Sequence, residues 1–357
     1  MATLTATGIQ DLMNSTLAEL GRDRIQMVAQ NYVDYPAFAL FHKKERMLED
    51  DGIQIWRNIQ IKKSNVSRFV GIGETDTVNI ENVTTTAKID WKYCDAHWGF
   101  FTQEVKLNKG KSKIFNLIDS RKNNAHLDLV ELINASLWTL PGASDTKSPN
   151  GIPYYIVKNS GTPGFNGGHP SGYSAVANIS RTTYANWKNY TGQYTTVSKA
   201  DLLTKMRTAY RACRFMDVEG LSIQDYRKGK DRYINFVNES TAASLENIGE
   251  AQNENLGRDV ASHEVQTGMG KDVYRFDGAL TFRRKPIVYE PYLDGDTSNP
   301  VYGLDLSTWC NYIHKDYNMH QNDVMMASDQ HNAFVVYIDH WWNLLCFDPR
   351  RNFVLYV

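Results

Sequence analysis

The sequence has few cysteines and no long hydrophobic run. Only 4 of its 357 residues are cysteine, and no two of them form a C-x-x-C pair. The first residues, Met1–Leu4, lack the basic and apolar stretches of a signal peptide. No apolar window approaches the ~20 residues that are needed to cross a bilayer. We therefore expect reduced thiols, a soluble chain made in a reducing compartment, and no membrane partner.

The sequence also lacks a surplus of charge of one sign. Its 39 basic and 40 acidic residues nearly cancel, so no strong field favours nucleic acid or a membrane surface. An apolar content of 42% and an aromatic content of 12% argue against disorder. A chain of this length can hold two or three cores, or one core with long excursions.

Motifs of the common catalytic and cofactor sites are incomplete. Gly71–Gly73 would need a third glycine at the position of Asp76 to form a dinucleotide-binding loop. His263 and Glu264 open a zinc-protease pattern, but Thr267 stands where the second histidine belongs. There is no G-x-S-x-G motif, and the C-terminal histidines lack the spacing of a metal site. These absences predict no enzyme activity, no cofactor and no metal.

A long amphipathic helix is predicted over Ser112–Thr139. Ser112 is the expected N-cap, and Pro141-Gly142 is a strong stop because proline cannot continue the hydrogen-bond ladder. Such a helix forms a rod of about 40 Å on which sheets can be laid. Apolar residues recur along it at three- and four-residue steps and their sums, namely Ile114, Ile118, Ala125, Leu129, Leu132 and Ile133.

Two alternating strands between residues 52 and 94 predict a long two-stranded arm with a polar tip. Each strand has one apolar face, consisting of Ile53, Ile55, Ile59 and Ile61 in the first and of Ala87, Ile89, Trp91 and Tyr93 in the second. An isolated hairpin of this length is marginally stable. We therefore expect its apolar face to rest on another surface.

The remaining segments alternate between helix and strand. Amphipathic helical pieces are expected before Tyr35, and a helix capped by Ser198 is expected to run to Phe215. Residues 152–157 read as a strand. The last sixty residues are rich in strands, so we expect the C-terminal segment to be tied into a sheet.

Two stretches of this sequence resemble a known family. Gly151, which opens the predicted strand, is followed later by Arg181 and then by Trp187 and Asn189 in a W-x-N pattern. This pattern and the order of the parts are similar to the major capsid proteins of tailed bacteriophages. The resemblance implies an α+β, Hong Kong 97-like phage capsid fold with an N-arm, an extended β-hairpin loop, a peripheral domain with a spine helix, and an axial domain.

The resemblance implies a division of the chain and a function. The segments would be an N-terminal arm (1–48), the extended loop (49–105), the peripheral domain (106–194), the axial domain (195–300) and closing strands (301–357). The function would be a structural one, as hexamers and pentamers that form an icosahedral head around double-stranded DNA. Partners would be further copies of the chain, a separate scaffolding protein, portal and decoration proteins, and non-specifically contacted DNA. The chain would be assembled in the host cytoplasm and located in the virion.

In this capsid interpretation the arm packs largely on a neighbouring subunit. The predicted assembly interface is Ile53, Ile55, Ile59, Ile61, Ile89, Trp91 and Tyr93. Some relatives cross-link a hairpin lysine to a neighbour, but Lys62 and Lys63 are better explained as solvated side chains. Two alternatives remain open: an encapsulin-like cage subunit, and a monomeric β-rich glycan-binding protein that uses Trp341, Trp342 or Trp187.

Overall fold

A computed structural model describes residues 35–43, 47–62, 64, 67–72, 82–107, 111–215, 232–254, 273–276, 279–283, 285–327 and 332–357. The chain divides into two compact units, each assembled from separate ranges. The described residues of the first unit fall within Cys94–Glu131 and Met319–Asp339. The second unit comprises Tyr35–Tyr93, Leu132–Asn318 and His340–Val357. The helices predicted before Tyr35 lie outside the described residues.

The first unit contains a sheet built around the first part of a long strand, β14. This strand pairs with β12, β13 and β4, and the first two of these pairings are antiparallel. In the same unit, Arg121 of α4 forms an ion pair with Glu104 of α3 at 2.9 Å and donates to the Gly99 carbonyl at 2.8 Å. The elements are β4 (Lys92–Phe101), α3 (Thr102–Leu107), α4 (Lys111–Leu137), β12 (His320–Gln321), β13 (Met325–Met326) and β14 (Ala333–Cys346).

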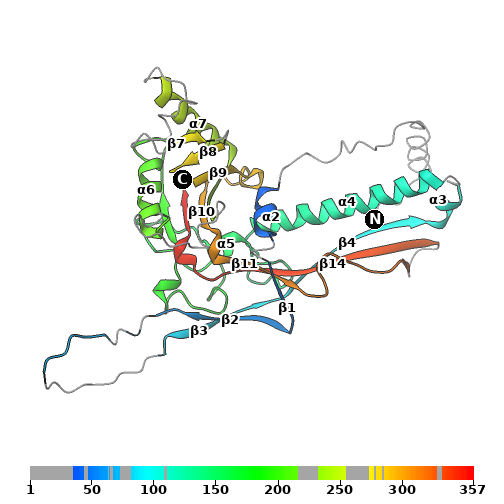
Figure 1. Ribbon diagram of the computed structural model, residues 1–357, viewed down its shortest axis with the longest axis horizontal. Coiled ribbons are helices and arrows are strands. Elements are labelled where there is room, and N and C mark those ends of the chain that lie inside the picture. Colours follow the sequence, from blue (N-terminus) through cyan, green and yellow to red (C-terminus); the bar gives the residue numbers. More distant parts are fainter. Residues whose placement is uncertain are drawn as a thin grey trace. The chain divides into compact units, whose positions relative to one another are not determined.

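Helix α4 confirms the predicted long helix, with two corrections (Figure 1). It begins at Lys111, so Ser112 lies inside the helix and is not its N-cap. Leu132 is 53% exposed and does not belong to the buried stripe. The buried apolar positions among residues 119–137 are spaced by four residues, a ridge that leaves residue 132 to one side. They are Ala125, Leu129, Ile133 and Leu137.

The second unit holds the larger sheet, whose strand order is β5-β15-β10-β6-β9-β8-β7. Every residue of β6, β10 and β15 is buried, including the polar Asn235 of β6 and Asp305 of β10. The prediction that the C-terminal segment is tied into a sheet is confirmed, because β15 pairs with both β5 and β10. The strands are β5 (Tyr190–Gln193), β6 (Tyr233–Val237), β7 (Val273–Phe276), β8 (Ala279–Phe282), β9 (Lys285–Tyr289), β10 (Val301–Asp305) and β15 (Phe353–Tyr356).

Helix α6 (Leu202–Cys213) packs on the β5 and β15 end of this sheet, and α7 (Glu239–Glu254) packs against β7 and β9 (Figure 1). The predicted buried face of α6 is confirmed at Leu202, Met206, Ala209 and Cys213. Its predicted cap is wrong, because Asp201 is the N-cap residue. Ser198 lies one turn earlier, where its Oγ accepts the Asp201 N–H at 3.2 Å.

The strand predicted at residues 152–157 is also wrong. Ile152–Tyr155 forms a short helix, α5, with Gly151 as its N-cap. Pro153 explains the difference, since its fixed φ suits the first turn of a helix and it has no N–H to give to a sheet. Short 3₁₀ segments complete the unit: η1 (Ala185–Trp187), η3 (Pro291–Leu293), η4 (Leu306–Thr308) and η5 (Pro349–Arg351).

The predicted two-stranded arm is present in the second unit. Strands β2 (Gln54–Gln60) and β3 (Thr84–Asp90) pair antiparallel, with Ile55 opposite Ile89. Nearby, β1 (Met47–Asp50) pairs parallel with β11 (Trp309–His314), which pairs with the last part of β14. Helix α2 (Pro36–Phe41) precedes these strands.

Candidate functional site

The four residues of the predicted family motif are all buried in the second unit. Asn189 holds the segment after α5, because its Nδ2 donates to the Val157 carbonyl and its Oδ1 accepts the Val157 N–H, each at 3.1 Å. The Trp187 indole N–H donates to the Val176 carbonyl at 3.2 Å. A Cβ at Gly151 would lie 2.3 Å from the Thr139 carbonyl oxygen, so only glycine fits this close approach.

Arg181 is the central group of this motif and has no exposed surface. Its guanidinium donates to the carbonyls of Gly168 and Tyr155 and to Asn189 Oδ1. Burial lowers the pKa of Arg181 to about 10, so the side chain remains charged at neutral pH. The motif residues therefore fix the backbone of a long loop region, and none of them is placed as a nucleophile or an acid–base catalyst.

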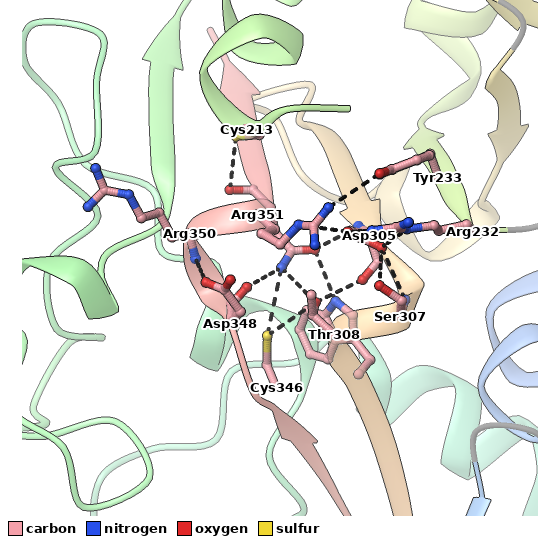
Figure 2. Close-up of polar contacts among 12 residues, drawn as sticks. Cys213, Arg232, Tyr233, Asp305, Ser307, Thr308, Cys346, Asp348, Arg350 and Arg351 are labelled. Carbon is pink, nitrogen blue, oxygen red and sulfur yellow. Dashed lines mark hydrogen bonds and ion pairs between the residues drawn. The ribbon is translucent and has the colours of Figure 1, made fainter. Parts of the chain in front are cut away.

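A second buried polar network, which the sequence reasoning missed, surrounds Asp305. Figure 2 shows Arg232, Arg351 and Ser307 converging on this carboxylate. Both arginines approach it through Nε at 3.0 Å, and the Ser307 hydroxyl donates at 2.6 Å. These contacts tie the end of β10 to the start of β6 and to η5.

Asn352 extends this network to the last strand. Its Oδ1 accepts the Asp305 N–H at 2.8 Å and the Trp309 indole N–H at 3.1 Å. Its Nδ2 donates to the Asp348 carbonyl at 3.0 Å. Asp305, one partner of the Asn352 amide, lies 47 residues away in the chain, so no local sequence pattern could reveal this contact.

The cysteines agree with the expectation of reduced thiols. All four, Cys94, Cys213, Cys310 and Cys346, are free. Burial raises the pKa of the Cys213 and Cys346 thiols well above the usual range. Burial also raises the pKa of Cys310 to about 11. These thiols are therefore unsuited to nucleophilic chemistry.

Much of the predicted assembly interface is covered within the chain itself. Ile55, Ile61, Ile89 and Trp91 are each less than one-tenth exposed. The arm is also attached to the rest of the second unit through hydrogen bonds. Arg57 Nε donates to the Tyr312 hydroxyl at 2.6 Å, and Asn186 Nδ2 donates to the carbonyl of Ile61 at 3.1 Å.

Much of the predicted polar tip, residues 73–81 included, lies outside the described residues, and the described part of the arm exposes apolar side chains. Phe69 and Ile72 are fully exposed and Val70 is more than half exposed. Closer to the base, Ile53 and Tyr93 are exposed, and Ile59 is half-buried. Exposed apolar side chains gathered on one segment mark an interaction surface. The residues that remain available for an interface are therefore Ile53, Ile59, Phe69, Val70, Ile72 and Tyr93.

The tryptophans proposed for a glycan platform are mostly inaccessible. Trp187 and Trp342 are almost completely buried. Trp341 stacks face to face on Tyr317, with ring centroids 3.9 Å apart, and the Tyr93 ring packs at 4.6 Å. The ring of Trp341 is thus packed against two other aromatic side chains.

Among the described residues, no three His, Cys, Asp or Glu side chains are grouped closely enough to hold a metal ion. Across the same ranges, no helix has the length and apolarity needed to pass through a bilayer. In the first unit, an open groove of about 360 Å³ runs between β4 and α4, and Trp98, Arg121 and Asp128 are among the residues that line it.

Comparison with solved structures identifies the fold as that of phage capsid proteins. The cyanophage A-1(L) capsid asymmetric unit is similar over 94% of this chain and 96% of its own, with a TM-score of 0.62 and 16% identity. The capsid of the native GTA particle is similar over 100% and 99%, with a TM-score of 0.56 and 9% identity. The capsid of Myoviridae phage XM1 is similar over 95% and 97%, with a TM-score of 0.52 and 10% identity.

These similarities confirm the predicted fold class across nearly the whole chain. No family model and no curated protein matches the sequence.

Proposed function

We propose that this chain is the major capsid protein of a tailed phage. The observation that carries the proposal is the similarity to capsid structures over at least 94% of both chains in each comparison. In this function the chain is a structural protein, not an enzyme, and it is located in the virion.

The proposed assembly consists of hexamers and pentamers of this chain, which form an icosahedral head around double-stranded DNA. Assembly would take place in the host cytoplasm, with separate scaffolding, portal and decoration proteins as further partners. DNA would be contacted without sequence specificity, in keeping with the near-zero net charge. The five-segment division from arm to closing strands belongs to the same proposal.

The surface proposed to join subunits is the exposed apolar part of the arm. Phe69, Val70 and Ile72 expose side chains that a neighbouring copy would remove from water. Ile53, Ile59 and Tyr93 would extend the interface toward the base of the arm. The buried residues of the same hairpin would instead hold the arm in its own subunit.

Electron microscopy of the purified recombinant protein, together with size-exclusion chromatography, tests this function. A capsid protein is expected to form capsomers or closed shells that contain no protein cargo. Closed cages filled with a cellular protein would favour the encapsulin-like alternative. A species that stays monomeric at every protein and salt concentration would contradict an assembling subunit.

A further inference from the structure

A buried carboxyl group lies where α2, α4 and the end of β9 meet in the second unit. Glu290 has no exposed surface, and its N–H donates to the Val237 carbonyl at 2.9 Å. Asn134 of α4 donates from Nδ2 to Glu290 Oε1 at 3.2 Å. The Oδ1 of the same Asn134 accepts the Phe38 N–H of α2 at 3.0 Å. The amide of Asn134 thus connects the carboxyl group to the helix.

No cation balances this carboxyl group. Among the described residues it forms no ion pair, and its Oε2 has no hydrogen-bond partner. Burial raises the pKa of Glu290 to about 7, while the Asn134 amide, the peptide N–H groups of Ala37 and Tyr292, and the Trp138 indole oppose the shift. The group therefore changes charge close to neutral pH.

The ionisable groups around Glu290 do not stabilise its negative charge. The Tyr289 phenol next to it has a raised pKa, because it donates a hydrogen bond to Asp294 and also lies close to the charges of Glu239 and Glu290. The other two charged groups in this set, Asp294 and Glu239, are both acidic and therefore supply no positive charge to this side of Glu290. From α4, Asn134 contributes only a neutral amide.

The other titratable group on this side is His42, which follows α2. Its Nδ1–H donates to the Phe38 carbonyl at 3.2 Å, and its Nε2 accepts from Asn311 at 3.1 Å. Burial lowers the pKa of His42 to about 4. Burial and the nearby charge of His42 lower the pKa of His340 to about 3. Both rings are therefore neutral in the range where Glu290 titrates.

We propose that Glu290 and Asn134 form a proton-sensitive latch that holds α2 against α4. The latch is tight when Glu290 is protonated and loosens when the carboxyl group ionises, because the cost of burying the charge exceeds the stabilisation from the hydrogen bonds that the carboxylate accepts. This inference does not depend on the capsid function, because every contact lies within one chain.

The sign of the effect follows from proton linkage. A carboxyl group whose pKa is raised in the docked state binds its proton more tightly there than when α2 is undocked. Docking is therefore strongest below the ordinary pKa of about 4.5 and weakens as the pH rises to about 7. Above about pH 7 the loss of docking free energy is complete and no longer changes with pH.

Hydrogen exchange of the α2 amides in wild type and in Glu290→Gln tests the proposal. The Ala39 and His42 amides report on α2, since they donate within it to Tyr35 and Phe38. We compare the equilibrium constant for opening of α2 in the wild type with that in the variant. Their ratio should rise about tenfold per pH unit from about pH 5 to pH 7, to at most about 300-fold, and then level off. The two histidines are present in both proteins, so their titration cancels in this ratio.

The matched control is Glu131→Gln, which removes an exposed carboxyl group from the same α4 helix and should give a ratio independent of pH. Glu290→Leu provides a second uncharged variant of similar volume if the glutamine variant does not fold. A wild-type to variant ratio that stays constant across this pH range, or that falls as the pH rises, would overturn the latch.

Discussion

Single side chains with distant backbone partners hold the loop regions of this fold. Asn189 bonds to both peptide groups of Val157, 32 residues earlier, and also accepts from Arg181. A side-chain amide is suited to this role because it can donate and accept simultaneously. The loops around it are thereby fixed without belonging to a sheet.

Replacement of Asn189 by alanine should therefore destabilise the subunit by about 2–4 kcal/mol. The change leaves the Val157 peptide groups and part of a buried guanidinium without partners. Urea unfolding followed by circular dichroism measures the loss. Asn123→Ala is the matched control, since Asn123 is exposed on α4, and we expect it to cost less than about 1 kcal/mol.

For single residues, the sequence identified structurally important positions but not the contacts that their side chains make. Gly151, Arg181, Trp187 and Asn189 were selected by resemblance, and all four are buried. Their contacts are with backbone atoms far along the chain, which no local pattern encodes. Asp305 was not selected for the same reason, because its partner Arg232 lies 73 residues away.

Among the elements, α4 shows what hydrophobic period can and cannot predict. The hydrophobic period predicted the helix and three of its buried positions, Ala125, Leu129 and Ile133. It also included Leu132, because a three-residue step fits a helix face even when the packed ridge follows four-residue steps. At residues 152–157 the apolar run suggested a strand, although Pro153 favours the start of a helix.

Two leucines of α4, the buried Leu129 and the exposed Leu132, provide a direct test of the buried ridge. Leu129→Asp places a carboxylate at a position that is 1% exposed and should cost about 3–5 kcal/mol, enough to reduce the yield of soluble subunit. Leu132→Asp makes the same chemical change at an exposed position of the same helix. We expect less than about 1 kcal/mol there. Equal melting temperatures for the two variants would show that the ridge is assigned incorrectly.

For the whole molecule, the arm is the feature whose prediction changed most. Sequence alternation correctly indicated an apolar face, but not which surface covers it, because that depends on tertiary packing. Much of this face is buried in the second unit, whereas Phe69, Val70 and Ile72 lie exposed farther along the arm. Deletion of residues 58–86 would therefore also remove Ile61, which is buried, and would confound stability with assembly.

Substitution at the exposed positions separates the two effects. The triple variant Phe69→Ser, Val70→Ser and Ile72→Ser should fold with a nearly unchanged melting temperature, because Phe69 and Ile72 are fully exposed and Val70 is more than half exposed in the isolated subunit. Shell formation should be abolished or severely reduced, seen as loss of the high-mass peak in size-exclusion chromatography.

The matched control replaces exposed polar residues of the same arm, Gln60→Ala and Ser67→Ala, and should assemble normally. Normal shells from the triple serine variant would remove the assembly role proposed for this segment.

The position of β14 and β15 in the chain has a consequence for synthesis on the ribosome. β14 is the strand on which β4, β12 and β13 pair in the first unit, and β15 lies between β5 and β10 in the second. Among the described elements, β14 follows the other strands of its sheet in the chain, and β15 follows those of the larger sheet, although domains otherwise tend to fold in order of synthesis. Neither sheet can close before its late strand has left the ribosome, so a nascent chain cannot present a finished subunit to its neighbours. Translation itself would thus delay association until both strands have been made.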